Sequence, residues 1–265
     1  MATDILDVLN AIHAKDEPYA VATVVETTGS VSAKTSAKAV IDQHGQIIAG
    51  WVGGGCAESA TCEAALASME SGQTTILDID MDDEVLGVGM PCGGSMRVYV
   101  EPVMPKPTMW LMGHGRVAEC LAQLGSMMGL KVVVNDPIVT PERYPDADRL
   151  IIDDMDYDQL RPTASDYVVI ATQHKGDHES MKKALSSGAG YIALIASRKR
   201  AGLVMDYLKE EGFADDKLTR VMAPAGIDLG AMTPEEIALS VMSEIVLERR
   251  QGSAQRMRDK IKAGL

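Results

Sequence analysis

The pattern of hydrophobic positions along the chain changes near residue 105. Before that point, apolar residues at helical spacing predict helices over residues 3–14 and 57–70. Runs rich in apolar and β-branched residues predict strands at residues 19–26, 38–42, 46–52, 74–79 and 95–101. Helices mixed with hairpin-forming strands predict an N-terminal mixed α/β domain over residues 1–104.

A Pro-rich segment at residues 102–107 separates this part from the rest of the chain. Beyond it, short apolar runs alternate with helical stripes. The predicted strands are residues 109–112, 131–135, 149–152, 167–171 and 191–195, and the predicted helices are residues 117–128, 176–187, 198–211 and 234–250. Strands that alternate with helices fold as right-handed βαβ units, so residues 105–265 are predicted to form a doubly wound parallel sheet of the Rossmann type.

Charge and cysteine content narrow the class of protein. The 265 residues carry a net charge of −13, which argues against binding to nucleic acid or to a membrane surface, because those partners need a basic protein. No apolar run reaches the length of a membrane helix, and the first residues lack the order of a signal peptide, so we expect a cytoplasmic protein. The four cysteines have no CxxC spacing, so we expect reduced thiols and no zinc ribbon.

A run of glycines follows the third predicted strand. Gly53, Gly54 and Gly55 lie between that strand and a predicted helix, and Cys56 comes directly after them. Glycine lets backbone N–H groups approach a ligand closely, and the start of a helix favours an anion such as phosphate. A thiol in the first turn of a helix is also easier to ionise. The alternative is a tight turn whose glycines only ease packing between strand and helix.

A second cysteine lies beside glycines in the same domain. Cys92, Gly93 and Gly94 immediately precede the predicted strand at residues 95–101. Because the two sites share this composition, we interpret them as a pair, with Cys56 and Cys92 as candidate thiols for contacting a soft metal or a transferable sulfur. This pairing requires both cysteines to lie in one cleft.

The first strand of the second domain ends in a turn typical of Rossmann domains. Gly113, Gly115 and Ala118 form a Gly-x-Gly-x-x-Ala pattern between a strand and a helix, and Asp136 ends the next strand. This arrangement predicts a pyrophosphate at the helix start and Asp136 on a ribose hydroxyl, with Arg116 as a candidate phosphate ligand. The alternative is a Rossmann domain that binds a ligand other than a dinucleotide, or that has lost its ligand.

One alternative function is an NAD(P)-dependent oxidoreductase that uses the Rossmann domain. Such an enzyme needs an acid or base, and His114, His174 and Lys175 are the side chains that could move a proton. A non-catalytic nucleotide sensor or scaffold is a third possibility. The basic run at residues 197–200 either binds an anion at a helix start or is ordinary surface charge.

Five segments together resemble the XdhC/CoxI family. They are residues 29–30, 50–58, 92–102, 113–118 and 223–240, in the family's order and over nearly the whole chain. In that family an XdhC/CoxI domain is joined to a C-terminal Rossmann domain. Many members have a Pro-Arg pair where this chain has the loop at residues 31–38, which makes the sequence more similar to the CoxI-type branch.

Members of that family are accessory proteins of molybdenum hydroxylases such as xanthine dehydrogenase and carbon monoxide dehydrogenase. The resemblance implies a maturation factor rather than an enzyme. It would bind molybdenum cofactor (molybdopterin, with or without a nucleotide), support its sulfuration with a cysteine desulfurase, and pass it to the apo molybdenum hydroxylase. The cofactor-binding candidates are then the residues of the three turns and Asp136. Apolar helices around Leu124 and Met242 are candidates for a homodimer surface.

Overall fold

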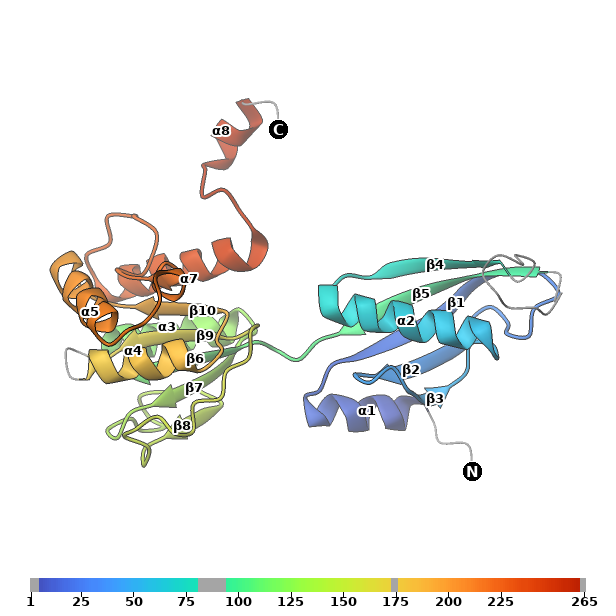
Figure 1. Cartoon of the computed structure of the whole chain (residues 1–265), viewed down its shortest axis with the longest axis horizontal. Coiled ribbons are helices and arrows are strands. Elements are labelled where there is room, and N and C mark those ends of the chain that lie inside the picture. Colours follow the sequence, from blue (N-terminus) through green and yellow to red (C-terminus); the bar gives the residue numbers. More distant parts are fainter. Residues whose placement is uncertain (1–4, 81–93, 173–175, 263–265) are drawn as a thin grey trace. The chain divides into compact units, whose positions relative to one another are not determined.

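The computed structural model describes residues 5–80, 94–172 and 176–262. The chain divides into two compact units, Met1–Pro105 and Lys106–Leu265, here called unit 1 and unit 2, and each unit has its own sheet (Figure 1). Among the described residues, no helix combines the length and the apolar character needed to cross a bilayer.

Unit 1 is built on an antiparallel sheet with the strand order β3-β2-β1-β5-β4. Its strands are β1 (Tyr19–Gly29), β2 (Lys38–Asp42), β3 (Ile47–Gly50), β4 (Thr75–Asp80) and β5 (Gly94–Val103). β1 and β5 pair along their length, from Tyr19 opposite Val103 to Gly29 opposite Gly94. Gly29 and Gly94 therefore lie side by side at one end of this long ribbon.

Different helices cover the two faces of this sheet. Successive residues of a strand point to opposite faces. Ala22 of β1 joins the core that contains α2 (Cys56–Ser71), whereas Tyr19 joins a smaller cluster with Ile12 of α1 (Ile5–Lys15). Figure 1 shows the two helices on either side of the strands.

Unit 2 is built on a parallel sheet with the strand order β11-β10-β9-β6-β7-β8. Its strands are β6 (Thr108–Gly113), β7 (Lys131–Asn135), β8 (Arg149–Ile151), β9 (Tyr167–Ala171), β10 (Tyr191–Leu194) and β11 (Val221–Met222). The direction in which strands are added reverses between β6 and β9. In open α/β sheets, ligands bind outside the carboxyl ends of the strands at such a point.

Helices pack on both faces of the parallel sheet. One core joins α3 (Arg116–Met127) and α7 (Pro234–Arg250) to the strands, and a second core joins α4 (Asp177–Ser186) and α5 (Arg198–Glu210). The short helices α6 (Asp215–Leu218) and α8 (Met257–Lys262) follow α5 and α7 along the chain. These sheets and layers confirm the predicted fold class, a mixed α/β unit followed by a Rossmann-type unit.

Some elements differ from their prediction for identifiable reasons. β5 continues through Pro102 to Val103, inside the predicted linker, because both residues pair with the start of β1. The elements α6, β11 and α8 were not predicted, since such short segments show no clear period. Met242 is buried in the core of unit 2, and Leu124 packs against the same cluster. Met242 is therefore not available to a partner, while a homodimer surface on the exposed parts of these helices stays a prediction.

Candidate functional site

The glycine run of unit 1 forms an open turn between β3 and α2. Gly53 and Gly55 have φ angles of +116° and +60°, in the region that favours glycine. A Cβ at Gly54 or Gly55 would meet no atom within 4 Å, so the turn has open space beside it. Cys56 is the first residue of α2 and is partly exposed. The structure thus places a thiol and the N-terminal N–H groups of a helix at one accessible turn.

One loop brings Gly53 and Gly94 to the same end of unit 1. A Cβ on Gly94 would lie 2.9 Å from atoms of residues 30–31, and a Cβ on Gly53 would lie 3.6 to 3.9 Å from the side chains of residues 32–33. The two glycines therefore contact consecutive parts of the loop that follows β1. Cys56 follows Gly53 by three positions, and Cys92 precedes Gly94 by two. The loop thus contacts one described glycine from each of the two predicted cysteine-bearing turns.

Gly94 itself has a packing reason to be glycine. A Cβ there would lie 2.6 Å from the carbonyl oxygen of Thr28 on the paired strand. No side chain fits this approach of β1 and β5. Cys92 and Gly93 lie outside the described residues, so their contact with a cofactor and the pairing of Cys92 with Cys56 stay predictions.

The described cysteines lie in different environments. Cys62, also on α2, packs against the core of unit 1. Burial raises the pKa of its thiol most, and the negative charges of Glu58 and Asp42 raise it further. Cys120 of α3 is buried, and burial raises its pKa as well. The thiolate is the form that binds metals and attacks sulfur, so both thiols are poorly suited to that chemistry. Cys56, at a helix start beside open space, is the better candidate.

The Rossmann turn of unit 2 has its glycines where the fold requires them. Gly113 ends β6 with a φ angle of +120°, and a Cβ there would overlap the carbonyl group of Ala171 at the end of β9. Gly115 is the N-cap of α3, with a φ angle of +101°. Its N–H donates a hydrogen bond of 3.1 Å to the hydroxyl of Tyr144. One backbone donor of the turn is therefore already satisfied by a side chain.

The other predicted ligand groups of this turn also have partners within the chain. The Oδ2 atom of Asp136 lies 2.9 Å from Nδ1 of His114, and its Oδ1 atom accepts a hydrogen bond from the N–H of Ile138. The side chain of Arg116 is 61% exposed, and its Nε donates a hydrogen bond of 2.8 Å to Glu235. The structure brings His114 and Asp136 together at the turn, and it turns Arg116 toward α7.

Tyr144 is a residue of this site that the sequence did not predict. It lies between β7 and β8, 29 positions after Gly115, and no motif marks it. Its side chain is 3% exposed, and burial raises its pKa to about 12. The adjacent Arg143 donates to Glu119 of α3 over 2.7 Å. Arg143 and Tyr144 thus connect the loop between β7 and β8 to the start of α3 by hydrogen bonds.

Removing the hydroxyl of Tyr144 is expected to destabilise unit 2. In Tyr144→Phe the Gly115 N–H loses its acceptor, which should cost about 1–3 kcal/mol of unfolding free energy. Burial raises the pKa of Tyr144 from 10.0 to about 12, so the folded state disfavours the ionised phenol. The stability that depends on a neutral Tyr144 is therefore fully present below pH 10 and is lost between pH 10 and 12. Urea unfolding at several pH values measures both effects.

Tyr207→Phe is the matched control for this experiment. The hydroxyl of Tyr207 lies 3.5 Å from Glu179 at an exposed position of the same unit, so its loss should change stability by less than about 0.5 kcal/mol. Equal unfolding midpoints for Tyr144→Phe and Tyr207→Phe would show that the hydrogen bond to Gly115 contributes nothing.

The carboxyl end of β9 carries a buried polar cluster. The hydroxyl of Thr172 donates to the carboxylate of Asp177 at the start of α4, and Arg200 of α5 contacts the same carboxylate. Asp177 is 3% exposed, and burial lowers the pKa of Arg200. Arg200 therefore joins α5 to α4 and is not available as surface charge. His174 and Lys175 lie outside the described residues.

Family models match both units of the chain. A model described as the XdhC Rossmann domain matches residues 109–245, just over half of the chain, and one described as the XdhC and CoxI family matches residues 12–80. Among solved structures, a crystal structure of a xanthine dehydrogenase from Bacillus halodurans has a TM-score of 0.49 and 20% identity, covering 94% of this chain and 96% of that chain.

Curated relatives match over part of their own length. The chain is 30% identical over 241 residues to the uncharacterized protein YqeB of Escherichia coli (strain K12), covering 86% of this chain and 43% of that protein. It is 28% identical over 161 residues to a probable xanthine dehydrogenase subunit of Bacillus subtilis (strain 168), covering 58% of this chain and 47% of that protein. The chain thus spans less than half the length of these relatives. With both family models matched in order along it, the chain belongs to the XdhC/CoxI family.

Proposed function

We propose that this protein is an accessory factor of a molybdenum hydroxylase of the xanthine dehydrogenase or carbon monoxide dehydrogenase type. It binds molybdenum cofactor, assists the sulfuration of that cofactor with a cysteine desulfurase, and delivers it to the apoenzyme. The observation that carries the proposal is the match of the two family models to the two units. The relative from Bacillus subtilis, a probable subunit of xanthine dehydrogenase, supports the choice of client class.

The turn before α2 has the chemical groups that this cofactor needs. Molybdenum cofactor carries a phosphate and a sulfur-rich metal centre. The N–H groups at the start of a helix suit the phosphate, and a cysteine thiolate suits the sulfur-rich centre. Open space at Gly54 and Gly55 leaves room for a ligand beside Cys56. When bound, the cofactor supplies the metal and its redox chemistry, while this turn holds it and keeps the thiol beside it.

The turn of unit 2 gives less support to the alternative, an NAD(P)-dependent oxidoreductase. Binding of NAD(P) in the usual Rossmann manner uses the glycine turn for pyrophosphate and an acid for ribose. Here the N–H of Gly115 bonds to Tyr144, and Asp136 bonds to His114. A dinucleotide, whether NAD(P) or an extended form of molybdenum cofactor, would have to replace these contacts.

Loss of this protein from its host is expected to remove most of the activity of sulfur-dependent molybdenum hydroxylases, because hydroxylase that receives no sulfurated cofactor stays inactive. The amount of hydroxylase polypeptide should stay the same. A molybdenum enzyme of the sulfite oxidase class, whose cofactor needs no sulfuration, is the control and should keep its activity. Unchanged hydroxylase activity in the deletion strain would reject the proposal.

A further inference from the structure

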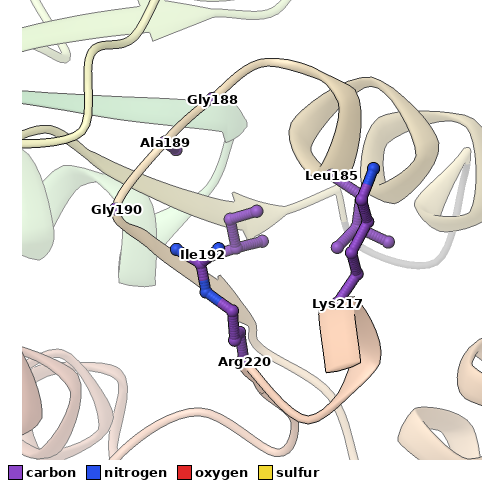
Figure 2. Close-up of a pocket in the computed structure, with 7 residues that line it drawn as sticks. All are labelled: Leu185, Gly188, Ala189, Gly190, Ile192, Lys217 and Arg220. Atoms are coloured by element: carbon purple, nitrogen blue, oxygen red, sulfur yellow. The ribbon is translucent and has the colours of Figure 1, made fainter. Parts of the chain in front are cut away.

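A small pocket lies at the amino-terminal edge of the sheet of unit 2, at the opposite end of the strands from the glycine turn. Its volume is about 100 Å³. It is lined by Leu185 near the end of α4, by residues 188–190 before β10, by Ile192 of β10, and by Lys217 and Arg220 around α6 (Figure 2). No residue of the two turns described above contributes to it.

Two cations line this pocket. Figure 2 shows the side chains of Lys217 and Arg220 on two sides of it, with Arg220 reaching toward Ile192 and Lys217 toward Leu185. Within the described part of the chain, neither side chain forms an ion pair with a carboxylate.

Other basic residues near the pocket are neutralised. On α4, the Nζ of Lys182 lies 2.7 Å from Glu211, and the Nζ of Lys183 lies 2.7 Å from Asp158. Lys217 and Arg220 differ from these two lysines, because no carboxylate of the described residues pairs with them. Lys217 and Arg220 therefore keep charge and hydrogen-bond donors for a ligand.

The rest of the lining is apolar or bare backbone. Gly188 has a φ angle of +88°, and a Cβ on Gly190 would overlap the carbonyl group of Ala164, so both positions favour glycine. Ala189 between them is 6% exposed. An anion can therefore approach the backbone of residues 188–190 without meeting a long side chain.

We propose that this pocket binds a phosphate group, either as inorganic phosphate or as a phosphate monoester. A phosphate carries a charge of about −1.5 to −2, which matches two cations better than the single charge of a carboxylate does. A guanidinium such as that of Arg220 can bind two of its oxygens at once. The volume of about 100 Å³ suits a group of this size and is too small for a nucleotide.

An adjoining cleft leaves room for the organic part of a monoester. Its volume is about 440 Å³, and it shares Gly190 and Arg220 with the pocket. Tyr191 and Arg249 are among its lining residues. Arg220 thus lines both the small pocket, which has the size of a phosphate, and the adjoining larger cleft. This site is separate from the proposed cofactor turn of unit 1, so each can be tested without the other.

Amide chemical shifts of the full chain test this inference directly. The ¹⁵N-labelled protein is titrated with potassium phosphate, or with glycerol 3-phosphate, against potassium chloride of equal ionic strength. Both titrations should give saturable shifts at residues 188–190 and around Arg220. Tighter binding of glycerol 3-phosphate would identify a monoester that uses the cleft, and equal affinity would identify free phosphate.

A double variant and a charge-matched control decide the outcome. Lys217→Ala with Arg220→Ala should weaken phosphate binding at least tenfold. Lys209→Ala with Arg256→Ala removes the same charge at exposed positions elsewhere and should leave the affinity unchanged. Saturable binding with equal affinity in all three proteins would overturn the proposal, as would shifts that match those produced by chloride.

Discussion

The Gly113→Ala variant is expected to lose about 3 kcal/mol or more of the unfolding free energy of unit 2. Gly113 has a φ angle of +120°, which an alanine rarely adopts, and the new Cβ would overlap the carbonyl of Ala171. Gly113 and Ala171 are also paired in the β6–β9 ladder, so neither backbone can move away without breaking strand pairing. Strain and steric overlap therefore add at this position.

Urea unfolding followed by the fluorescence of Trp110 measures this loss. Trp110 lies in β6 and is 7% exposed, and a Trp51→Phe background removes the tryptophan of unit 1 from the signal. Gly202→Ala in α5 is the matched control, because its Cβ would meet open space at an ordinary helical position, and it should stabilise unit 2 by about 0.5–1 kcal/mol. Equal stability of the two alanine variants would contradict the described contact at Gly113.

The Cys56→Ser variant is expected to retain on the order of one tenth or less of the bound molybdenum, since a hydroxyl is a much poorer ligand than a thiolate for a sulfur-rich centre. The substitution removes one sulfur atom at a partly exposed helix start, where the change in packing is small. The loss should therefore appear as altered binding with an unchanged circular dichroism spectrum.

Cys62→Ser is the matched control on the same helix. Its thiol packs against the core of unit 1, and burial raises its pKa, so it is not expected to contact the cofactor. Molybdenum content should stay near that of the unaltered protein. Equal losses in Cys56→Ser and Cys62→Ser would point to damage of α2 and would remove the specific role of Cys56.

Much of the fold could be predicted because the spacing of hydrophobic residues along the chain distinguishes helices from strands. In unit 2, short apolar strands alternate with amphipathic helices, and the rules for βαβ units then leave few arrangements of the sheet. The Gly113 turn was located for the same reason, since its pattern lies between a strand and a helix. The short strand β11 escaped prediction because two residues show no period.

The candidate site was predictable only where its residues are close in sequence. Gly53 to Cys56 form one local turn, and the structure places them as expected at the start of α2. Tyr144 reaches Gly115 across 29 positions, and His114 reaches Asp136 across 22, through contacts that depend on how the strands are ordered. Met242 shows a similar limit, because an apolar helix position gives no sign of whether its own unit or a partner covers it.

The molybdenum and pterin content of the full chain tests the central claim most directly. The protein is purified from a molybdate-replete host, molybdenum is measured by mass spectrometry, and pterin is measured by the fluorescence of its oxidised form. The proposed function predicts that both are bound in equal amounts and that Cys56→Ser loses both while Cys62→Ser keeps them. A correctly folded protein that carries neither molybdenum nor pterin, but binds NAD(H) tightly and turns it over, would contradict the account.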